Sequence, residues 1–211
     1  MRFRILNKDP MYDFREANKI TEGIDLEGMY NWKPKSETEW WIKQIVAYHS
    51  TLRCIHFRLV DTRPKSVIMQ IIRATKGHPQ PEVQSSRPDW TGKERSSDPY
   101  EDKLFMQDHT AESFIEMAKQ RMCRRTEERT CEFMSEMVKT LKKSKNPFLQ
   151  AVGYCCHANC WWFGGRCPEL KSCQVRDENK LSDSIIVHYR TDNNIPLRTK
   201  QEEAEETMER R

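Results

Sequence analysis

The sequence predicts a single α/β domain. Its 211 residues are enough for one domain of ordinary size, which buries roughly two-thirds to three-quarters of the surface of the unfolded chain. Alternating apolar residues predict short strands at residues 1–8 and around Phe57 and Leu59. Apolar residues spaced three and four apart predict helices between and after these strands. A strand that leads into a helix is the arrangement expected of an α/β domain.

Two amphipathic helices are expected in the first half of the chain. After the first strand comes a polar stretch interpreted as loop and short helix, and the first clear helical pattern then spans Glu37 to His49. The second helix begins near Pro64, which a first helical turn tolerates, and continues to about Thr75. Its apolar stripe consists of Val67, Ile68, Ile71 and Ile72.

The middle of the chain is polar. Residues 76–102 are rich in Pro, Gly, Ser and charge, and this segment is too long for a mere connector, so it is expected to be functional or disordered. A long helical region begins near Thr110, and its centre, residues 123–130, is almost purely polar. That centre is either a solvated face with charges paired along the helix or the lining of a site at a subunit interface.

The end of the chain completes the domain. Residues 182–190 have the pattern of a late strand. Residues 198–211 have high charge and no apolar stripe, so we expect a disordered tail after a domain that spans residues 1–197.

Charge and hydropathy argue against a dedicated duplex-DNA binder and against a membrane-spanning protein. Lys and Arg (36) nearly balance Asp and Glu (32), and a net charge of +4 is not that of a dedicated duplex-DNA binder. A local basic pocket for an anionic metabolite remains compatible with this charge. No run approaches the roughly eighteen apolar residues of a membrane span, and the N-terminus lacks the apolar core of a signal peptide. We therefore expect a cytoplasmic protein, in the host cytosol if a virus encodes it.

Eight cysteines form the first chemical feature. In a cytosolic chain they favour thiols, metal ligands or catalysis over a disulfide framework. The candidate ligands of a tetrahedral zinc ion are Cys156, Cys160, Cys167 and Cys173. Their spacing is irregular, and no pair shows the two-residue gap of a zinc knuckle, so free thiols are the favoured alternative.

A group of polar residues in the first half suggests an anion site. Gln70 and Arg73 near the end of the second helix are followed by His78, Ser85, Ser86 and Arg87. Guanidinium groups and hydroxyls are what a phosphate or a flavin pyrophosphate requires, although an exposed hydrophilic loop has the same composition. A run of three aromatic residues at 161–163, beside Arg166, is able to stack on bases, but buried packing is its commoner use.

Several motifs, taken in order, resemble those of the flavin-dependent thymidylate synthases. The resemblance spans about residues 40 to 175, and its most specific part is the cysteine block that ends the series. The matching segments are His49-Ser50-Thr51, Gln70-Ile71-Ile72-Arg73, Gln84-Ser85-Ser86-Arg87, Gln120-Arg121-Met122-Cys123, Cys160, Gly165-Arg166-Cys167-Pro168-Glu169 and Ser172-Cys173.

This resemblance implies a fold and an activity. The family fold is an α+β domain, like that of the thymidylate synthase-complementing proteins, with a central mixed or antiparallel sheet flanked by long helices. The family uses FAD, a reduced pyridine nucleotide and methylene-tetrahydrofolate to methylate C5 of deoxyuridylate, in a homotetramer with sites at subunit interfaces. The implied nucleotide-binding residues are Gln70, Arg73, Ser85, Ser86, Arg87, Arg121 and Arg129, and those for the cofactor are His49, Thr51, Arg73, His78 and Arg121. No protein nucleophile is implied.

Departures from the family motifs fall on arginines. Arg73-Ala74-Thr75 replaces Arg-His-Arg, Glu112 stands where an arginine contacts the nucleotide, and Arg129-Thr130-Cys131 replaces Glu-Ile-Arg. A glutamate in place of a phosphate-binding arginine turns attraction into repulsion. These changes predict either an altered pyrimidine substrate or, as the alternative, a catalytically decayed, zinc-stabilised protein that binds nucleotides or nucleic acid.

Overall fold

A four-stranded antiparallel sheet forms one layer of the molecule. The computed structural model describes residues 1–23, 33–74, 81–92, 94, 96–164, 166–168, 172–173 and 185–197. The strands lie in the order β1-β2-β4-β3, and every neighbouring pair is antiparallel. Their bounds are β1 Arg2–Ile5, β2 Phe57–Pro64, β3 Glu82–Val83 and β4 Asp102–His109. The α/β class is therefore confirmed, with an antiparallel sheet.

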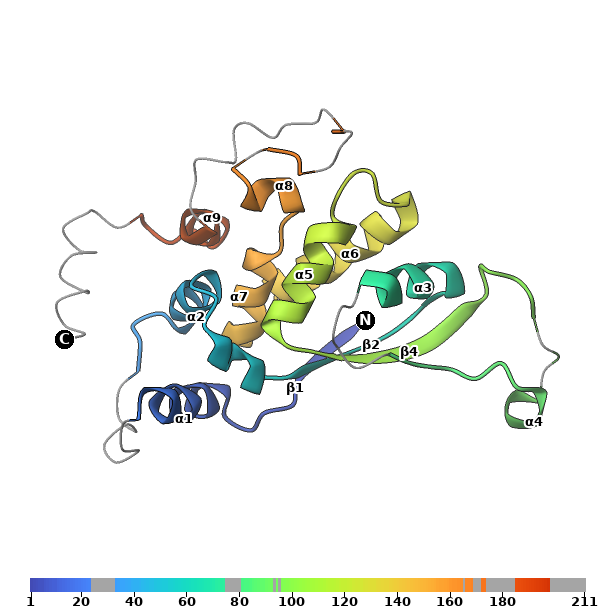
Figure 1. Cartoon of the computed structure of the whole chain (residues 1–211), viewed down its shortest axis with the longest axis horizontal. Coiled ribbons are helices and arrows are strands. Elements are labelled where there is room, and N and C mark those ends of the chain that lie inside the picture. Colours follow the sequence, from blue (N-terminus) through green and yellow to red (C-terminus); the bar gives the residue numbers. More distant parts are fainter. Residues whose placement is uncertain are drawn as a thin grey trace.

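Helices form the second layer, on one side of the sheet (Figure 1). This layer consists of α3 Lys65–Ala74, α5 Ala111–Arg121, α6 Glu128–Lys142 and α7 Pro147–Cys155. Farther along the same layer, α2 Glu37–Val46 packs against α7 and against α9 Ile185–Asp192. The remaining helical pieces are α1 Pro10–Glu22, η1 Ser50–Cys54, α4 Pro88–Thr91 and α8 Asn159–Trp162.

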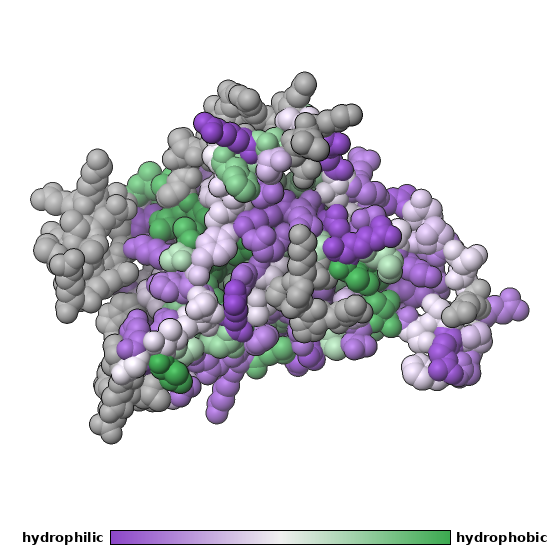
Figure 2. Space-filling model, viewed as in Figure 1, coloured by the Kyte–Doolittle hydropathy of each residue, from purple (hydrophilic) through white to green (hydrophobic). Residues whose placement is uncertain are grey.

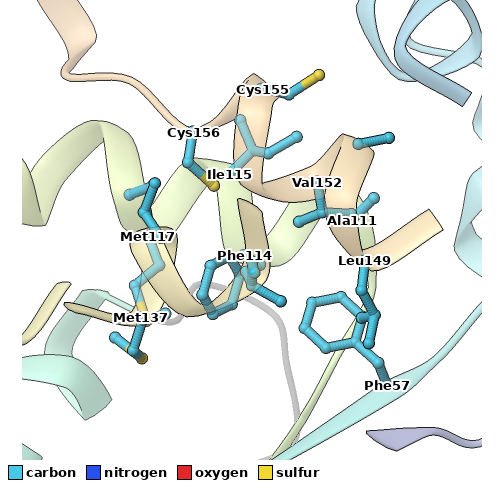
Figure 3. Close-up of a cluster of buried hydrophobic side chains, with 14 of the residues drawn as sticks. Phe57, Ala111, Phe114, Ile115, Met117, Met137, Leu149, Val152, Cys155 and Cys156 are labelled. Carbon is cyan, nitrogen blue, oxygen red and sulfur yellow. The ribbon is translucent and has the colours of Figure 1, made fainter. Parts of the chain in front are cut away.

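The core lies between the two layers. Phe57 and Leu59 point inward from β2 and are fully buried, whereas Arg58 and Val60, which alternate with them, are only partly covered. Figure 3 shows Phe57 and Leu149 close to Phe114, which projects from α5. Apolar side chains that alternate along the strand therefore pack against apolar side chains that repeat every three or four residues along the helices, and both patterns are visible in the sequence.

The sequence predicts the first half of the fold well. The first strand, the helix that begins at Glu37 and the strand around Phe57 are all present, although the helix ends at Val46 rather than at His49. Pro64 closes β2 instead of opening the next helix, which begins at Lys65. The polar stretch after β1 forms a longer helix than expected, because Asp9 accepts a hydrogen bond from the Tyr12 backbone and caps α1.

The long helix expected from Thr110 is wrong: the structure has two helices there. Helix α5 ends at Arg121, and the chain turns before α6 begins at Glu128. The Glu127 carboxylate accepts hydrogen bonds from the backbone and hydroxyl of Thr130, which caps α6. The polar run at residues 123–127 is therefore the turn between two helices and not the middle of one.

Two further strand assignments are corrected. The polar segment before Thr110 ends in β4, which the sequence pattern missed because three of its buried positions are Lys103, Gln107 and His109. The late strand expected at residues 182–190 is wrong for the part that the structure describes, since residues 185–192 form α9. Buried Arg190 holds this helix against α2 by two hydrogen bonds to Glu39, each 2.9 Å long.

Some expectations lie outside the described residues. These include His78, residues 182–184 and the tail at residues 198–211. Of the helices that the structure describes, none is both long enough and apolar enough to span a membrane.

Candidate functional site

A cleft of about 750 Å³ opens where the C-terminal end of α5 meets α3 and the segment that begins with α8. We call it the arginine cleft, and define it by Gln70, Arg121, Cys123, Cys160 and Arg166 among its lining residues. Its walls come from three separate parts of the chain. This is the convergence of polar groups in a cavity that is typical of a ligand site.

Two helices present the polar side chains of the cleft. Helix α3 buries Val67, Ile68 and Ile71 in the core. Gln70 and Arg73, three residues apart, share the opposite, more exposed face. Arg121 is the last residue of α5, whose first turn is fixed by a capping box between Thr110 and Ser113. The core contacts of both helices therefore set where the guanidinium groups lie.

Positive charge dominates the arginine cleft. Of the described residues that line it, Lys119, Arg121, Arg125 and Arg166 are cationic and one, Glu127, is a carboxylate; Lys119 is also paired with Glu116. A hydrogen bond from Thr130 lowers the pKa of Glu127, so this carboxylate stays ionised while it caps α6. The cleft thus has an excess of cations, which favours an anionic ligand.

Arg121 is partly buried and lies close to a second arginine. Burial lowers the pKa of Arg121, and the nearby charge of Arg73 lowers it further. Its buried Nε makes no hydrogen bond to any residue that the structure describes. An anion bound to both guanidinium groups would offset their mutual repulsion. The structure thus places Gln70 and Arg121 at one cleft and Arg73 near Arg121, although Arg73 itself lines neither this cleft nor the pocket described next.

The predicted serine loop lies elsewhere in the chain. Ser85, Ser86 and Arg87 line a second pocket of about 540 Å³ with Lys65, and no residue lines both this pocket and the arginine cleft. The Arg87 side chain donates to Asp89 at 2.7 and 3.2 Å. Hydroxyl groups and cations therefore line this second pocket, but within one chain it is separate from the cleft that Arg121 lines.

The other predicted binding residues line neither pocket. His49 is exposed, with its ring centroid 6.2 Å from that of Phe14. The Thr51 hydroxyl donates to Asn18 at 2.5 Å. Arg129, at the exposed start of α6, lies over the ring of Tyr100 at 4.5 Å. Within one chain, the predicted binding residues therefore lie at several separate positions on the molecule.

Glu112 does not place a negative charge in the arginine cleft. It lies at the start of α5, whereas Arg121 lies at its end. Arg53 donates to both oxygens of Glu112, at 2.7 and 3.2 Å. Within one chain, Glu112 is therefore paired with Arg53.

The structure divides the predicted zinc ligands. Cys156 is buried in the core, where Figure 3 shows it pointing toward Ile115 and Met117. Burial raises the pKa of the Cys156 thiol far above its usual range. The thiols of Cys160, Cys167 and Cys173 instead line the arginine cleft. Within one chain, Cys156 therefore lies apart from the other three cysteines.

The aromatic run is mostly used for packing. The Trp161 ring stacks on His157 with centroids 4.1 Å apart, and the Lys119 ammonium lies 4.8 Å from the centre of the Trp162 ring. Both tryptophans also line an apolar groove with residues of α2 and α9, and Figure 2 shows apolar side chains gathered over that part of the molecule. Only Phe163, 57% exposed, offers a free ring to solvent.

The sequence alone missed Lys119 and Cys123 as neighbours of the predicted site. Lys119 donates to Glu116 at 2.5 Å and to the Tyr48 hydroxyl at 2.6 Å, so its ammonium is fixed by two partners that do not line the cleft. Cys123 belongs to one of the resembling motifs, but no sequence spacing connects it with Cys160.

Comparison of the chain with family models, curated proteins and solved structures finds no match in any of the three.

Proposed function

We propose that the protein is a flavin-dependent enzyme that transfers a one-carbon group to C5 of a pyrimidine deoxynucleotide such as deoxyuridylate. The observation that carries this proposal is that Gln70 and Arg121 line one cleft, with Arg73 close enough to Arg121 to lower its pKa. Motif order alone points to these three positions, which come from two different helices. Their convergence supports a common ligand.

The chemistry of the arginine cleft fits a phosphate ester. Arginine forks bind phosphate oxygens through pairs of charge-assisted hydrogen bonds, and the orphan Nε of Arg121 is one such donor. Gln70 adds an amide that both donates and accepts, which suits the edge of a pyrimidine. The same donors suit the pyrophosphate of FAD, so Arg73 and Arg121 are the residues that would hold either anion.

Bound FAD would supply the hydride chemistry, with a reduced pyridine nucleotide as electron donor and methylene-tetrahydrofolate as carbon donor. The protein residues would bind and orient the reactants. Arg121 and Arg73 would fix the phosphate, and Gln70 would position the base. No cysteine or serine of the cleft needs to act as a nucleophile in this scheme.

We further propose a homotetramer with composite sites. The Ser85–Arg87 pocket and the arginine cleft each offer anion-binding groups, but one chain keeps them apart. In an assembly with closed symmetry, the loop of one subunit is able to complete the cleft of another. His49 and Thr51 on η1 would join the site in the same way.

The test starts with flavin content. The purified full chain is expected to be yellow, to bind FAD tightly and to release tritium from C5-tritiated deoxyuridylate when reduced pyridine nucleotide and methylene-tetrahydrofolate are present. Arg121→Met should abolish release, because the phosphate loses its buried partner. Arg124→Gln is the matched control, since Arg124 is an exposed arginine of the same turn and does not line the cleft.

Assembly is tested separately. Light scattering should give four chains, and mixed tetramers of Arg121→Met and Arg87→Met subunits should regain activity that neither variant has alone. Colourless protein that takes up no FAD would exclude the enzyme and favour the alternative, a binder of nucleotides or nucleic acid. A monomer that binds FAD would exclude the composite site.

A further inference from the structure

One face of the sheet has no helical layer over it. Helices α3, α5, α6 and α7 cover the other face, and none of the described helices lies across the outer side of β2 and β4 (Figure 1). Leu104, on this outer side, is 50% exposed. We call the surface the open sheet face and define it by Arg2, Arg58, Val60, Glu82, Leu104, Met106 and Asp108.

The strand register arranges the open sheet face in rows. Directly paired residues of an antiparallel sheet have their side chains on the same side. One row crosses all four strands and consists of Arg2, Val60, Met106 and Glu82. A cation therefore lies at one end of the row, a carboxylate at the other, and two apolar side chains between them. Arg2 and Glu82 are exposed, and neither forms an ion pair with any residue that the structure describes.

The neighbouring row has the same polarity. Arg58 on β2 is paired with Asp108 on β4, and its guanidinium donates to both carboxylate oxygens, at 2.6 and 2.7 Å. Arg4 on β1 is paired with Arg58 and adds an exposed cation. In both rows the cations thus lie on β1 and β2, and the carboxylates lie on β4 and β3.

We propose that the open sheet face binds the same face of a second copy of this chain, about a two-fold axis that runs along the strands between β2 and β4. Sheets that pack face to face lie about 10 Å apart, with their strands nearly aligned. This axis exchanges β1 with β3 and β2 with β4. Arg2 of each subunit would then lie over Glu82 of the other, and Val60 over Met106.

The order of charges selects this arrangement. A two-fold axis across the strands would place β1 over β1, so that Arg2 and Arg4 would face the same cations of the second subunit. Like charges at such distances repel, whereas the axis along the strands joins opposite charges in both rows. Each of these contacts occurs twice, because a two-fold interface is self-complementary. A second copy therefore has the charge order that the open sheet face requires.

The open sheet face is separate from the proposed reaction. None of its defining residues lines the arginine cleft or the Ser85–Arg87 pocket. The contact therefore does not depend on whether the protein binds flavin. In a homotetramer it would be one of two kinds of interface, and without the other kind it would give a dimer. Breaking the contact should halve the mass of the assembly in either case.

The experiment measures the mass of the full chain by light scattering at low salt. Glu82→Arg and Arg2→Glu should each halve the mass, because each places like charges over one another. The double variant Arg2→Glu/Glu82→Arg should restore it, since the pairs return with their signs exchanged. Glu22→Arg is the matched control, because Glu22 is an exposed glutamate at the end of α1 and lies on no strand.

Hydroxyl-radical labelling followed by mass spectrometry tests the surface without relying on a variant. Leu104 should be oxidised slowly in the unaltered chain, although it is half exposed in a single subunit, and faster in Glu82→Arg. A monomeric unaltered chain would overturn the proposal, as would a Glu82→Arg variant of full mass or rapid oxidation of Leu104 in the unaltered chain. A folded double variant that stays dissociated would overturn the orientation. If a variant does not fold, the labelling of the unaltered chain decides.

Discussion

The ion pair between Glu39 and Arg190 should be the most damaging polar contact to break. Arg190 donates two hydrogen bonds of 2.9 Å to the Glu39 carboxylate, and the two side chains are only 5% and 6% exposed. Arg190 also donates to the Pro196 carbonyl at 3.0 Å. The pair joins α2 to α9, so it fixes the C-terminal helix to the body of the protein.

Arg190→Met leaves the Glu39 carboxylate buried without its partner. Removing one member of such a pair costs about 3–5 kcal/mol of the free energy of unfolding. For a domain of this size that lowers Tm by about 6–20 °C. Urea unfolding followed by circular dichroism measures the loss directly, and the change should appear in the midpoint rather than in the slope.

The double variant Glu39→Leu/Arg190→Met is expected to recover most of that loss, because no charge remains buried. Arg53→Met is the matched control: it breaks an equally bidentate pair with Glu112, but Arg53 is 66% exposed, so the Tm should hardly change. A double variant no more stable than Arg190→Met would refute the reasoning. So would an Arg190→Met variant as stable as the control.

Three further outcomes follow from buried or paired groups. Gly153→Ala should destabilise the fold by about 1–3 kcal/mol in urea unfolding, because a Cβ there would lie 2.7 Å from the backbone nitrogen of Lys142; an unchanged midpoint would contradict this. Hydrogen bonds from Arg58 lower the pKa of Asp108 in the folded protein, so the stability that this ion pair contributes is present at neutral pH and is lost as the pH falls through that lowered pKa. The Tm of Asp108→Asn should therefore decline less in acid than the Tm of the unaltered chain. Burial raises the pKa of Cys155 and Cys156, so iodoacetamide followed by mass spectrometry should label them only after unfolding, and rapid labelling of native protein would argue against this packing.

The fold could be predicted where apolar residues occupy the buried positions. In β2, buried Phe57 and Leu59 alternate with more polar residues, and this pattern predicts the strand. In β4 the buried positions include Lys103, Gln107 and His109, polar residues that a sequence pattern assigns to the surface. The burial of Lys103 costs little because its ammonium donates a hydrogen bond to Glu101 at 2.7 Å. The periodicity of apolar residues does not predict this contact.

Helix α9 shows a second limit of sequence patterns. A run of β-branched residues at 185–187 favours a strand. The structure makes it a helix, and Ile185, Tyr189 and Arg190 then face the body of the protein on one side. The buried contact with Glu39, 151 positions earlier, outweighs the local preference. Sequence patterns that compare neighbouring residues cannot predict a partner so far away in the chain.

The arginine cleft shows which part of a site local spacing is able to predict. Gln70 and Arg121 line this cleft from two helices whose other faces are anchored in the core by Ile71 and Met117, both fully buried. The apolar stripe of each helix is visible in the sequence, and it sets which side of the helix its polar residues occupy. The approach of α3 to α5 is a different matter, because it depends on contacts between residues far apart in the chain. Cys167 and Cys173 line the same cleft but belong to neither a helix nor a strand, so no periodicity predicts their place there.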